Sequence, residues 1–262
     1  MEIQAVVLDL DGTLLNKQTK ISNRNKEVLK KLIDKGVKVF LATGRAPAAS
    51  AHFHQQLGLE TVMICSNGTM IYDRINDRNM KHFTMPKEVA ISILEGFKPH
   101  VSNILGFYDQ LVYSLTNDQV VEWWKVSFQR TPDYIGDFAH LLQHDISKFE
   151  IFLKDRQVIF HHEELEESLS DQIYLLKSPG YIEIMPKGTS KWHALKEVLT
   201  YYDLDPARTI AFGDGNNDIE MITNVGMGVA MGNAIADLKQ VAKDTTINHD
   251  EDGVAYFLEK YL

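Results

Sequence analysis

Short apolar runs alternate with helical patterns in the first third of the chain, and this alternation limits the possible folds more than any other feature. The runs are rich in Val and Ile, and the helical segments end at Gly36 and Gly58, a residue type that often terminates helices. The predicted strands are residues 3–8, 37–42 and 61–65, and the predicted helices are residues 23–35 and 46–57. Continuously apolar strands separated by helices predict βαβ units around a buried parallel sheet.

The same order of elements returns at the end of the chain. Residues 191–202 and 218–224 have helical patterns, and residues 209–212 and 228–231 are apolar runs of strand length. We therefore expect the two ends of the chain to form a single α/β domain.

The middle of the chain has a different pattern, in which polar and apolar residues alternate along strands that form hairpins. The predicted strands are residues 104–108, 111–115, 149–153, 173–176 and 181–185, and the helical patterns cover residues 87–97, 118–128 and 158–169. Turns are predicted at Asp109-Gln110 and Ser178-Pro179-Gly180. This mixture predicts an α+β domain inserted into the α/β one. The expected division is a discontinuous core of residues 1–83 and 187–262, with an inserted domain of residues 84–186.

The composition excludes several classes of protein. With 262 residues, 44% of them hydrophobic and 24% charged, the chain can bury a sizeable core. The formal charge of −9 and the lack of a basic run argue against a nucleic-acid partner, although a small anion could bind in a locally positive pocket. The single cysteine, Cys65, cannot form an internal disulfide. Because the sequence has neither a secretion signal nor an apolar stretch of about 18 residues, we expect a cytoplasmic protein with no membrane partner.

An acidic pair follows the first predicted strand. Asp9 and Asp11 stand at i and i+2, so their side chains point to the same side while the chain stays extended. They lie at the carboxyl end of a parallel strand, where open α/β sheets bind ligands. Close carboxylates repel each other unless they share a proton or bind a cation, and oxygen ligands beside a phosphate suit Mg²⁺. Gly12 allows a sharp turn that exposes amide groups to an anion, which favours a site over the alternative of a solvated turn.

A second acidic loop occurs at residues 213–218 (GDGNND), again between a predicted strand and a predicted helix. Asp214 and Asp218 supply its carboxylates. The alternative interpretation is a turn in which Asp218 caps the helix, and capping is compatible with metal binding. An EF-hand is excluded because the loop lacks the regular spacing and the distal Glu of that motif.

Thr43 and Lys191 occupy two further positions at a strand end or a helix start. Thr43 follows a predicted strand, where a hydroxyl and free backbone amides can hold an anion, although alone it would be an N-cap or turn residue. Lys191 begins a predicted helix, whose dipole also favours negative charge, although alone it would be a surface lysine. Together these positions supply two acidic clusters, a hydroxyl and a cation, which are the groups of a phosphoryl-transfer centre.

These segments resemble the motifs of the haloacid dehalogenase superfamily, and within it the Cof-type phosphatases of subfamily IIB, which carry a C2-type cap. Residues 9–13 (DLDGT) resemble the nucleophile motif, Thr43 the hydroxyl motif, Lys191 the lysine motif and residues 213–218 the acidic motif. The long insert between Thr43 and Lys191 is similar to the cap of that group, and residues 66–68 (SNG) resemble the turn after its third core strand. The resemblance implies an α/β, Rossmann-like parallel-sheet core with an inserted α+β cap domain.

The resemblance also implies a role for each matched residue. Asp9 would attack phosphorus and form an aspartyl phosphate, and Asp11 would act as general acid and then as general base. Mg²⁺ would be held by the Asp9 carboxylate, the Asp11 backbone carbonyl and Asp214, with Asp218 orienting the water around the ion or Lys191. The residues that would hold the phosphoryl oxygens are Leu10, Gly12, Thr43, Gly44, Lys191 and Asn217.

The expected function is that of a magnesium-dependent phosphatase for small phosphorylated metabolites, with sugar phosphates as the first expectation and residues 84–186 selecting the leaving group. A phosphosugar mutase is the alternative enzyme. It must bind a second phosphate, and the insert supplies only Arg130 and Arg156 as guanidinium groups. A ligand-binding regulator without turnover is a third possibility, against which the intact Asp9 and Asp11 count.

Overall fold

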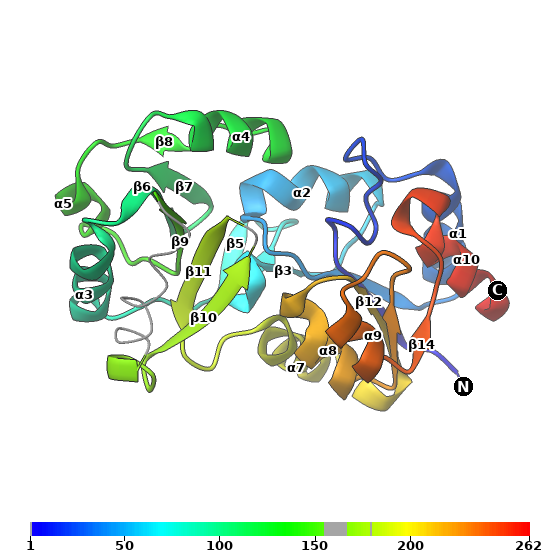
Figure 1. Cartoon of the computed structure of the whole chain (residues 1–262). Helices are drawn as coiled ribbons and strands as arrows, with labels where there is room; N and C mark the ends of the chain where they lie inside the picture. Colours follow the sequence, from blue (N-terminus) through cyan, green and yellow to red (C-terminus); the bar gives the residue numbers. More distant parts are fainter. Residues whose placement is uncertain (1, 155–166, 179) are drawn as a thin grey trace. The chain divides into compact units, whose positions relative to one another are not determined.

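The computed structural model describes residues 2–154, 167–178 and 180–262 (Figure 1). The chain divides into two compact units with separate hydrophobic cores. Unit 1 comprises Met1–Gly44, Ser50–Met80 and Ser190–Leu262, and unit 2 comprises Arg45–Ala49 and Lys81–Thr189. To cross a membrane, a helix would need more length and apolarity than any helix among the described residues has.

Five parallel strands form the main sheet of unit 1, in the order β14-β13-β12-β1-β2. Their bounds are β1 (Ala5–Leu8), β2 (Lys38–Leu41), β12 (Thr209–Gly213), β13 (Met227–Ala230) and β14 (Asp244–Thr245). The register places Val6 between Val39 of β2 and Ile210 of β12, so the first strand pairs with strands from both ends of the chain. All of β1 is buried, as a strand covered on both faces must be. The predicted parallel α/β sheet is confirmed.

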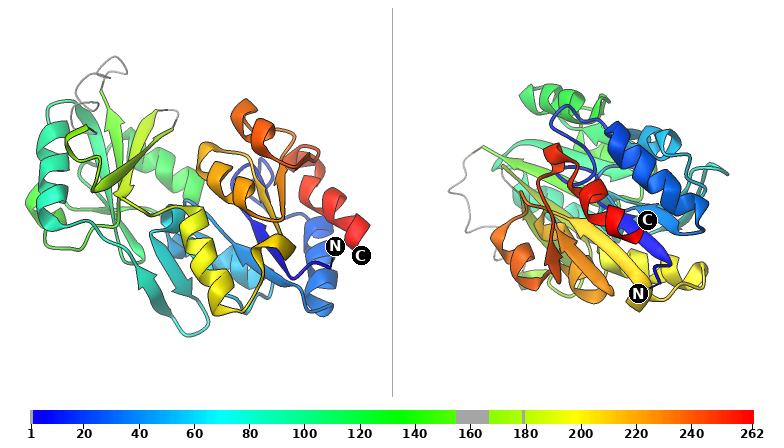
Figure 2. Two further views of the ribbon diagram at one scale, coloured as in Figure 1. Left: turned by 90° about the horizontal axis from the view of Figure 1, so that it is seen from below. Right: turned by 90° about the vertical axis from the view of Figure 1, so that its right-hand side faces the viewer.

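Two groups of helices cover this sheet (Figure 2). The helices with residues in unit 1 are α1 (Asn23–Asp34), α2 (Pro47–Gln56), α7 (Lys191–Tyr201), α8 (Ile219–Asn224), α9 (Ala236–Val241) and α10 (Gly253–Leu258). Helix α1 packs beside α10, while α7 and α9 both pack against α8. The side chain of Ser22 caps α1 by accepting a hydrogen bond from Asn25 N, and Gly36 follows the helix with a φ of +89°. Glycine thus ends the helix as predicted.

The third predicted strand pairs differently from the expectation. It belongs to a small sheet of β3 (Met63–Cys65), β4 (Met70–Asp73) and β5 (Arg78–His82). A single parallel bridge, between Ala42 and Ile64, links β3 to the main sheet. The chain reverses directly after β3 because Ser66 and Asn67 both adopt the left-handed backbone conformation, and this brings β4 alongside as an antiparallel partner.

Unit 2 contains a six-stranded sheet in the order β10-β11-β9-β6-β7-β8. Its strands are β6 (Val101–Tyr108), β7 (Leu111–Ser114), β8 (Asp133–Tyr134), β9 (Lys148–Leu153), β10 (Ile173–Ser178) and β11 (Tyr181–Pro186). The helices that the structure describes in this unit include α3 (Lys87–Phe97), α4 (Gln119–Phe128) and α5 (Phe138–Leu141). The predicted turn at Asp109-Gln110 joins β6 and β7, with Asp109 in the left-handed conformation. The antiparallel hairpins confirm the α+β character expected for the middle of the chain.

The two faces of this second sheet bury different cores. Ile104 packs with Val89 of α3, whereas its neighbours Leu105 and Phe107 pack with Trp124 of α4. Successive residues of β6 point to opposite faces, so one strand serves both cores.

The predicted helix boundaries lie close to those in the structure. Helix α3 spans the predicted residues 87–97, and α1 and α7 each end one residue before the predicted end. The predicted helix at 158–169 lies largely in residues 155–166, which are outside the described residues, and Arg156 lies there too. Pro179 of the second predicted turn is also outside the described residues.

Candidate active site

The carboxyl ends of β1, β2 and β12 meet at one edge of the parallel sheet of unit 1. Asp9 comes directly after β1, Thr43 lies two residues after β2, and Asp214 comes directly after β12. The last residues of β1 and β2 are opposite each other in the register, and β12 continues one residue further. The fold therefore gathers these side chains at the edge where open α/β sheets bind ligands.

Lys191 connects the two acidic loops. It is the first residue of α7, whose N-cap Ser190 accepts a hydrogen bond from His193 N at 3.1 Å. Its Nζ donates to Asp9 Oδ1 and to Asp218 Oδ1, each at 2.7 Å. Lys191 is only 1% exposed, so the alternative of a surface lysine is excluded.

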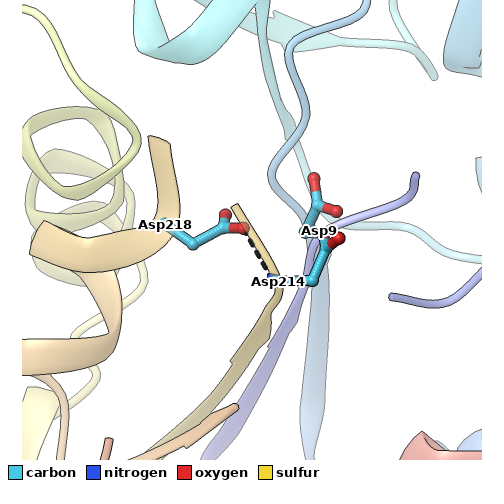
Figure 3. A group of neighbouring side chains, drawn as sticks. All are labelled: Asp9, Asp214 and Asp218. Carbon is cyan, nitrogen blue, oxygen red and sulfur yellow. Dashed lines mark hydrogen bonds between the residues drawn. The ribbon is translucent and has the colours of Figure 1, made fainter. Parts of the chain in front are cut away.

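Both carboxylate oxygens of Asp218 accept hydrogen bonds from the protein. Oδ2 accepts a bond from Asp214 N at 3.0 Å (Figure 3). Oδ2 also accepts a bond from Gly215 N at 3.1 Å, and Oδ1 accepts the bond from Lys191. The carboxylate turns back over its own loop and makes no side-chain cap to α8. Asp218 thus fixes the backbone of Asp214 and the ammonium of Lys191 together.

Asp214 packs directly against the loop that follows β1. Gly12 has a φ of +77°, and a Cβ at this position would lie 2.2 Å from Asp214 Oδ2, so only glycine fits. Thr13 Oγ1 donates to Asp214 Oδ1 at 3.3 Å. Asp9, Asp214 and Asp218 each offer one oxygen, and these oxygens all lie within 4.8 Å of one another (Figure 3).

The charges of this group are incompletely balanced. Burial raises the pKa of Asp9 above its usual range; the ammonium of Lys191 opposes this shift, and the neighbouring carboxylates add to it. Burial and the charge of Asp218 raise the pKa of Asp214 to about 7. Burial alone would lower the pKa of Lys191, but the charges of Asp218 and Asp9 outweigh it and raise that pKa. Lys191 therefore stays protonated.

The three carboxylates fit a divalent cation. When all three carboxylates are ionised, they and the ammonium carry a net charge of −2, which a divalent cation would neutralise. Carboxylate oxygens are the hard ligands that Mg²⁺ prefers. Because both oxygens of Asp218 already accept hydrogen bonds, Asp9 and Asp214 are the better candidates for direct contact. In the described part of the chain, this is the one group of at least three His, Cys, Asp or Glu side chains with such spacing.

Asp11 lies outside the group of three carboxylates. The chain leaves the extended conformation at Leu10, and Asp11 forms an isolated bridge with Leu15 in the loop beyond. The extended conformation thus ends at Leu10, and a common side for Asp9 and Asp11 stays a prediction. The charge of Asp11 nevertheless contributes to the raised pKa of Asp9. Asp11 is exposed, in contrast to the buried Asp9.

Asn67, expected only as part of a turn, connects Asn217 with Thr43. Its Oδ1 accepts a hydrogen bond from Asn217 Nδ2 at 2.9 Å, and its backbone N donates to Thr43 O at 3.0 Å. A Cβ on Gly44 would lie 3.1 Å from the same Oδ1. The signal was present in the sequence, because Asn67 is a polar residue two positions after a predicted strand, as Asp214 is.

Gly68 anchors this turn on the helix that carries Lys191. Its φ is +92°, and a Cβ would lie 2.1 Å from the backbone oxygen of Ser190. The turn thus packs backbone against backbone on the residue before Lys191.

Comparison with known proteins adds independent information. The model of the haloacid dehalogenase-like hydrolase family matches residues 6–258. The chain is 32% identical over 265 residues to the 5-amino-6-(5-phospho-D-ribitylamino)uracil phosphatase YitU of Bacillus subtilis (strain 168), with 98% of this chain and 97% of that protein covered. It is 28% identical over 280 residues to the pyridoxal phosphate phosphatase YbhA of Escherichia coli (strain K12), with 100% of both chains covered.

Solved structures agree with these sequence matches. A haloacid dehalogenase-like hydrolase from Bacteroides thetaiotaomicron has a TM-score of 0.88 and 28% sequence identity, with 100% of both chains covered. The matched region therefore spans both units.

Proposed function

The chain belongs to the haloacid dehalogenase-like hydrolases and is a phosphomonoester hydrolase of that family; from this premise we propose a magnesium-dependent reaction through an aspartyl phosphate on Asp9. The contacts of Lys191 are the observation that carries the proposal. Its ammonium lies 2.7 Å from carboxylate oxygens of Asp9 and Asp218, beside Asp214. A buried cation at this position offsets the repulsion between an attacking carboxylate and a phosphate.

In the first step, a carboxylate oxygen of Asp9 forms a bond to phosphorus while the bond between phosphorus and the leaving oxygen breaks. The attack needs the charged form of Asp9, which the ammonium of Lys191 favours by lowering the pKa that burial raises. Asp11 donates a proton to the leaving oxygen as general acid. The exposed position of Asp11 supports this role, because its carboxyl group can exchange protons with water.

In the second step, Asp11 acts as general base. It takes a proton from a water molecule whose oxygen attacks the phosphorus of the aspartyl phosphate. The bond between phosphorus and Asp9 breaks, which releases inorganic phosphate and restores both carboxyl groups to their initial states.

The phosphoryl oxygens require donors throughout both steps. We assign this task to the Thr43 hydroxyl, the Lys191 ammonium, the Asn217 amide and the backbone amides of Leu10, Gly12 and Gly44. The contact of Asn67 with Asn217 supports the assignment, since it holds the Asn217 amide in place on the side of Thr43.

The Asp9 and Asp214 carboxylates and the Asp11 backbone carbonyl are our proposed ligands for Mg²⁺, with Asp218 orienting the groups around them. When bound, the ion would supply a positive charge that neutralises the carboxylates and polarises a phosphoryl oxygen. The two excess negative charges of the group and the engaged oxygens of Asp218 support this division of roles.

Small phosphorylated metabolites are the proposed substrates, with sugar phosphates to be tested first. The relatives YitU and YbhA are named for a phosphoribitylamino uracil and for pyridoxal phosphate, which supports this class. We also propose that residues 84–186 form a cap that selects the leaving group, and that residues 1–83 and 187–262 form the catalytic core. A cytoplasmic location stays a prediction from the sequence.

The test measures inorganic phosphate released from a panel of phosphorylated metabolites, with Mg²⁺ present and after its removal with EDTA. We expect sustained release from sugar phosphates without a bisphosphate activator, loss of release with EDTA and recovery when Mg²⁺ is added. Acid-quenched enzyme should carry a phosphoryl group on the peptide that contains Asp9, detectable by mass spectrometry. Asp9→Asn should show neither release nor phosphoryl group, whereas Asp34→Asn, at an exposed aspartate of α1, should behave like the wild type.

Three outcomes would overturn the proposal. Phosphate release that is unaffected by EDTA would exclude Mg²⁺ from the mechanism. A phosphoryl group on a different peptide would exclude Asp9 as the nucleophile. Binding of the metabolites without any release would favour a regulator. An isomeric phosphate formed only with a bisphosphate activator would favour a mutase.

A further inference from the structure

The loop after β13 is another strand end at the same edge of the parallel sheet, and it is tied to the acidic loop. Met231 N donates to Gly213 O at 3.0 Å, and Ile235 N donates to Asp214 O at 3.0 Å. The two bonded residues of the loop flank its polar residue, Asn233, so both sides of Asn233 are held against residues 213 and 214. The side chain of Asn233 is thereby fixed next to Asp214.

Asn233 contacts both acidic loops through one amide nitrogen. Its Nδ2 donates to Gly12 O at 2.8 Å and to Asp214 Oδ2 at the longer distance of 3.4 Å. Its Oδ1 accepts a hydrogen bond from His249 N at 3.1 Å. Because a backbone N–H can only donate, the oxygen must face His249, and the NH₂ group must face Gly12 and Asp214. The orientation of the amide is therefore determined by its contacts.

A third segment, the turn at His249–Glu251, holds Asn233 through the hydrogen bond from His249 N. His249 begins a 3₁₀ turn, and its Nδ1 donates to Leu15 O at 2.7 Å. Asp250 in the same turn accepts a hydrogen bond from Lys17 N at 2.8 Å. The segment that holds Asn233 is thus itself bonded to the loop that contains Gly12. The amide cannot rotate without losing the bond to His249.

We propose that Asn233 is a positioning residue that sets the spacing between the Asp9 loop and Asp214. The side chain of Asp214 lies against the backbone of Gly12, so a shift of the loop that contains Gly12 would change the distance between the carboxylates of Asp9 and Asp214. Asn233 opposes that shift by binding Gly12 O and Asp214 Oδ2 at the same time. The inference rests on the proposed function, in which these two carboxylates hold the cation.

Asn233→Ala tests the inference through metal binding and kinetics. Isothermal titration of the full-length protein with Mg²⁺ alone should show a dissociation constant about 10-fold above that of the wild type, as for other residues that orient metal ligands. With p-nitrophenyl phosphate at saturating Mg²⁺, kcat should fall about 10-fold while KM stays within about threefold, because Asn233 orients ligands without contacting substrate. Asn233→Asp keeps an acceptor for His249 N but has no donor for Gly12, so its kcat should fall at least as far.

Asn248→Ala is the matched control. Asn248 caps the same 3₁₀ turn by accepting a hydrogen bond from Asp250 N at 3.0 Å. Its loss should lower the melting temperature but leave the Mg²⁺ dissociation constant within about twofold. A wild-type kcat in Asn233→Asp, or equal Mg²⁺ affinities for wild type and folded Asn233→Ala, would overturn the inference. Failure of the wild type itself to bind Mg²⁺ or to hydrolyse the ester would instead contradict the proposed function.

Discussion

Each unit buries a lysine between two carboxylates, and the two groups differ in their surroundings. In unit 1 the ammonium of Lys191 makes the two contacts of 2.7 Å described above. In unit 2 the ammonium of Lys148 donates to Glu150 Oε1 at 2.8 Å and to Glu183 Oε2 at 2.9 Å. Both lysines are 1% exposed, so burial of the cation does not distinguish the two groups.

The group of unit 2 lies in the middle of a sheet. Lys148 and Glu150 are on β9, and the register places Glu150 opposite Glu183 on β11. The Lys148 ammonium also lies 4.1 Å from the ring centre of Phe107, which packs in one core with Trp124. Paired backbones and aromatic rings surround these charges, so the group is built as part of a core.

The group of unit 1 lies where strands end, and it contains a third carboxylate, Asp214. Its surplus is two negative charges, whereas the group of unit 2 has a surplus of one. A lysine buried between carboxylates is therefore insufficient evidence for an active site. Position at strand ends and the larger negative surplus distinguish the proposed catalytic group from the group of unit 2.

Asp9→Asn gives the largest expected difference between the two groups. We predict a loss of turnover of about 10⁴-fold or more, since the amide cannot form the aspartyl phosphate. Glu150→Gln, the corresponding change in unit 2, should retain turnover within about threefold because the Lys148 group takes no part in the chemistry. Phosphate-release assays on both purified variants provide the comparison. Similar losses in the two variants would contradict the distinction.

Replacing each lysine by Met compares the groups in terms of stability. Lys148→Met leaves two buried carboxylates without their cation and should lower the free energy of unfolding by about 3–5 kcal/mol. Lys191→Met should also destabilise the protein, but added Mg²⁺ should restore part of that loss because a divalent ion can neutralise the same carboxylates. Urea denaturation with and without Mg²⁺ measures both effects. The prediction fails if Mg²⁺ stabilises the Lys148→Met variant as much as the Lys191→Met variant.

Gly68→Ala tests how strongly the catalytic group depends on backbone fit. The added Cβ would clash with Ser190 O, and the residue has a left-handed φ, so we expect the free energy of unfolding to fall by about 3 kcal/mol. Turnover should also fall, because the clash displaces Lys191. Gly36→Ala is the matched control, since Gly36 has a similar φ of +89° but nothing within 4 Å of its Cβ position. Gly36→Ala should lower the free energy of unfolding by only about 1 kcal/mol and leave turnover unchanged. Equal losses for both variants would show that contact with Ser190 is unimportant.

The pH dependence of stability should show the smallest effect, through Glu150. Burial raises the pKa of Glu150, although Lys148 opposes the shift. The folded state then keeps this proton to a higher pH than the unfolded state, so the stability that the proton contributes is fully present below pH about 4.5 and is lost as the pH rises through the folded pKa. The side chain in Glu150→Gln does not titrate, so this variant does not lose stability in this way as the pH rises. Its free energy of unfolding, relative to wild type, should therefore increase between pH 4 and pH 8 in urea denaturation.

Glu122→Gln is the control for this titration, because Glu122 is exposed beside Lys125 on α4. Its stability curve should run parallel to that of the wild type. Parallel curves for Glu150→Gln as well would show that the charge of Lys148 fully compensates the burial of Glu150.

Local sequence patterns were sufficient to predict most of the fold. The apolar run of β1 and the glycine after α1 follow directly from strand and helix preferences. The turn at residues 66–68 was identified by its resemblance, but the pairing of β3 with β4 was not predicted. That pairing depends on the chain reversal that the left-handed Ser66 and Asn67 produce.

The candidate site was predictable where a polar residue directly follows a strand, as Asp9 and Asp214 do. The side-chain arrangement of Asp11 was not predictable, because it depends on where the chain turns after Leu10. The role of Asn233 also escaped detection, since its partners Gly12 and His249 are distant in the sequence. The buried Lys148 group shows the converse problem: polar residues that alternate along a strand usually face solvent, and only the pairing of β9 with β11 reveals otherwise.

The place of β1 between β2 and β12 has a consequence for the order of events during synthesis on the ribosome. Strand β2 follows β1 closely, but β12 leaves the ribosome roughly 200 residues later, which at 5–20 residues per second is about 10–40 s. Throughout this interval one edge of β1 lacks its native partner, whereas all six strands of the sheet in unit 2 are made before β12. Asp9 is among the first residues made, and it gains Lys191 and Asp214 only in the final part of translation. A nascent chain thus carries the residue that we propose as nucleophile long before the chain can use it.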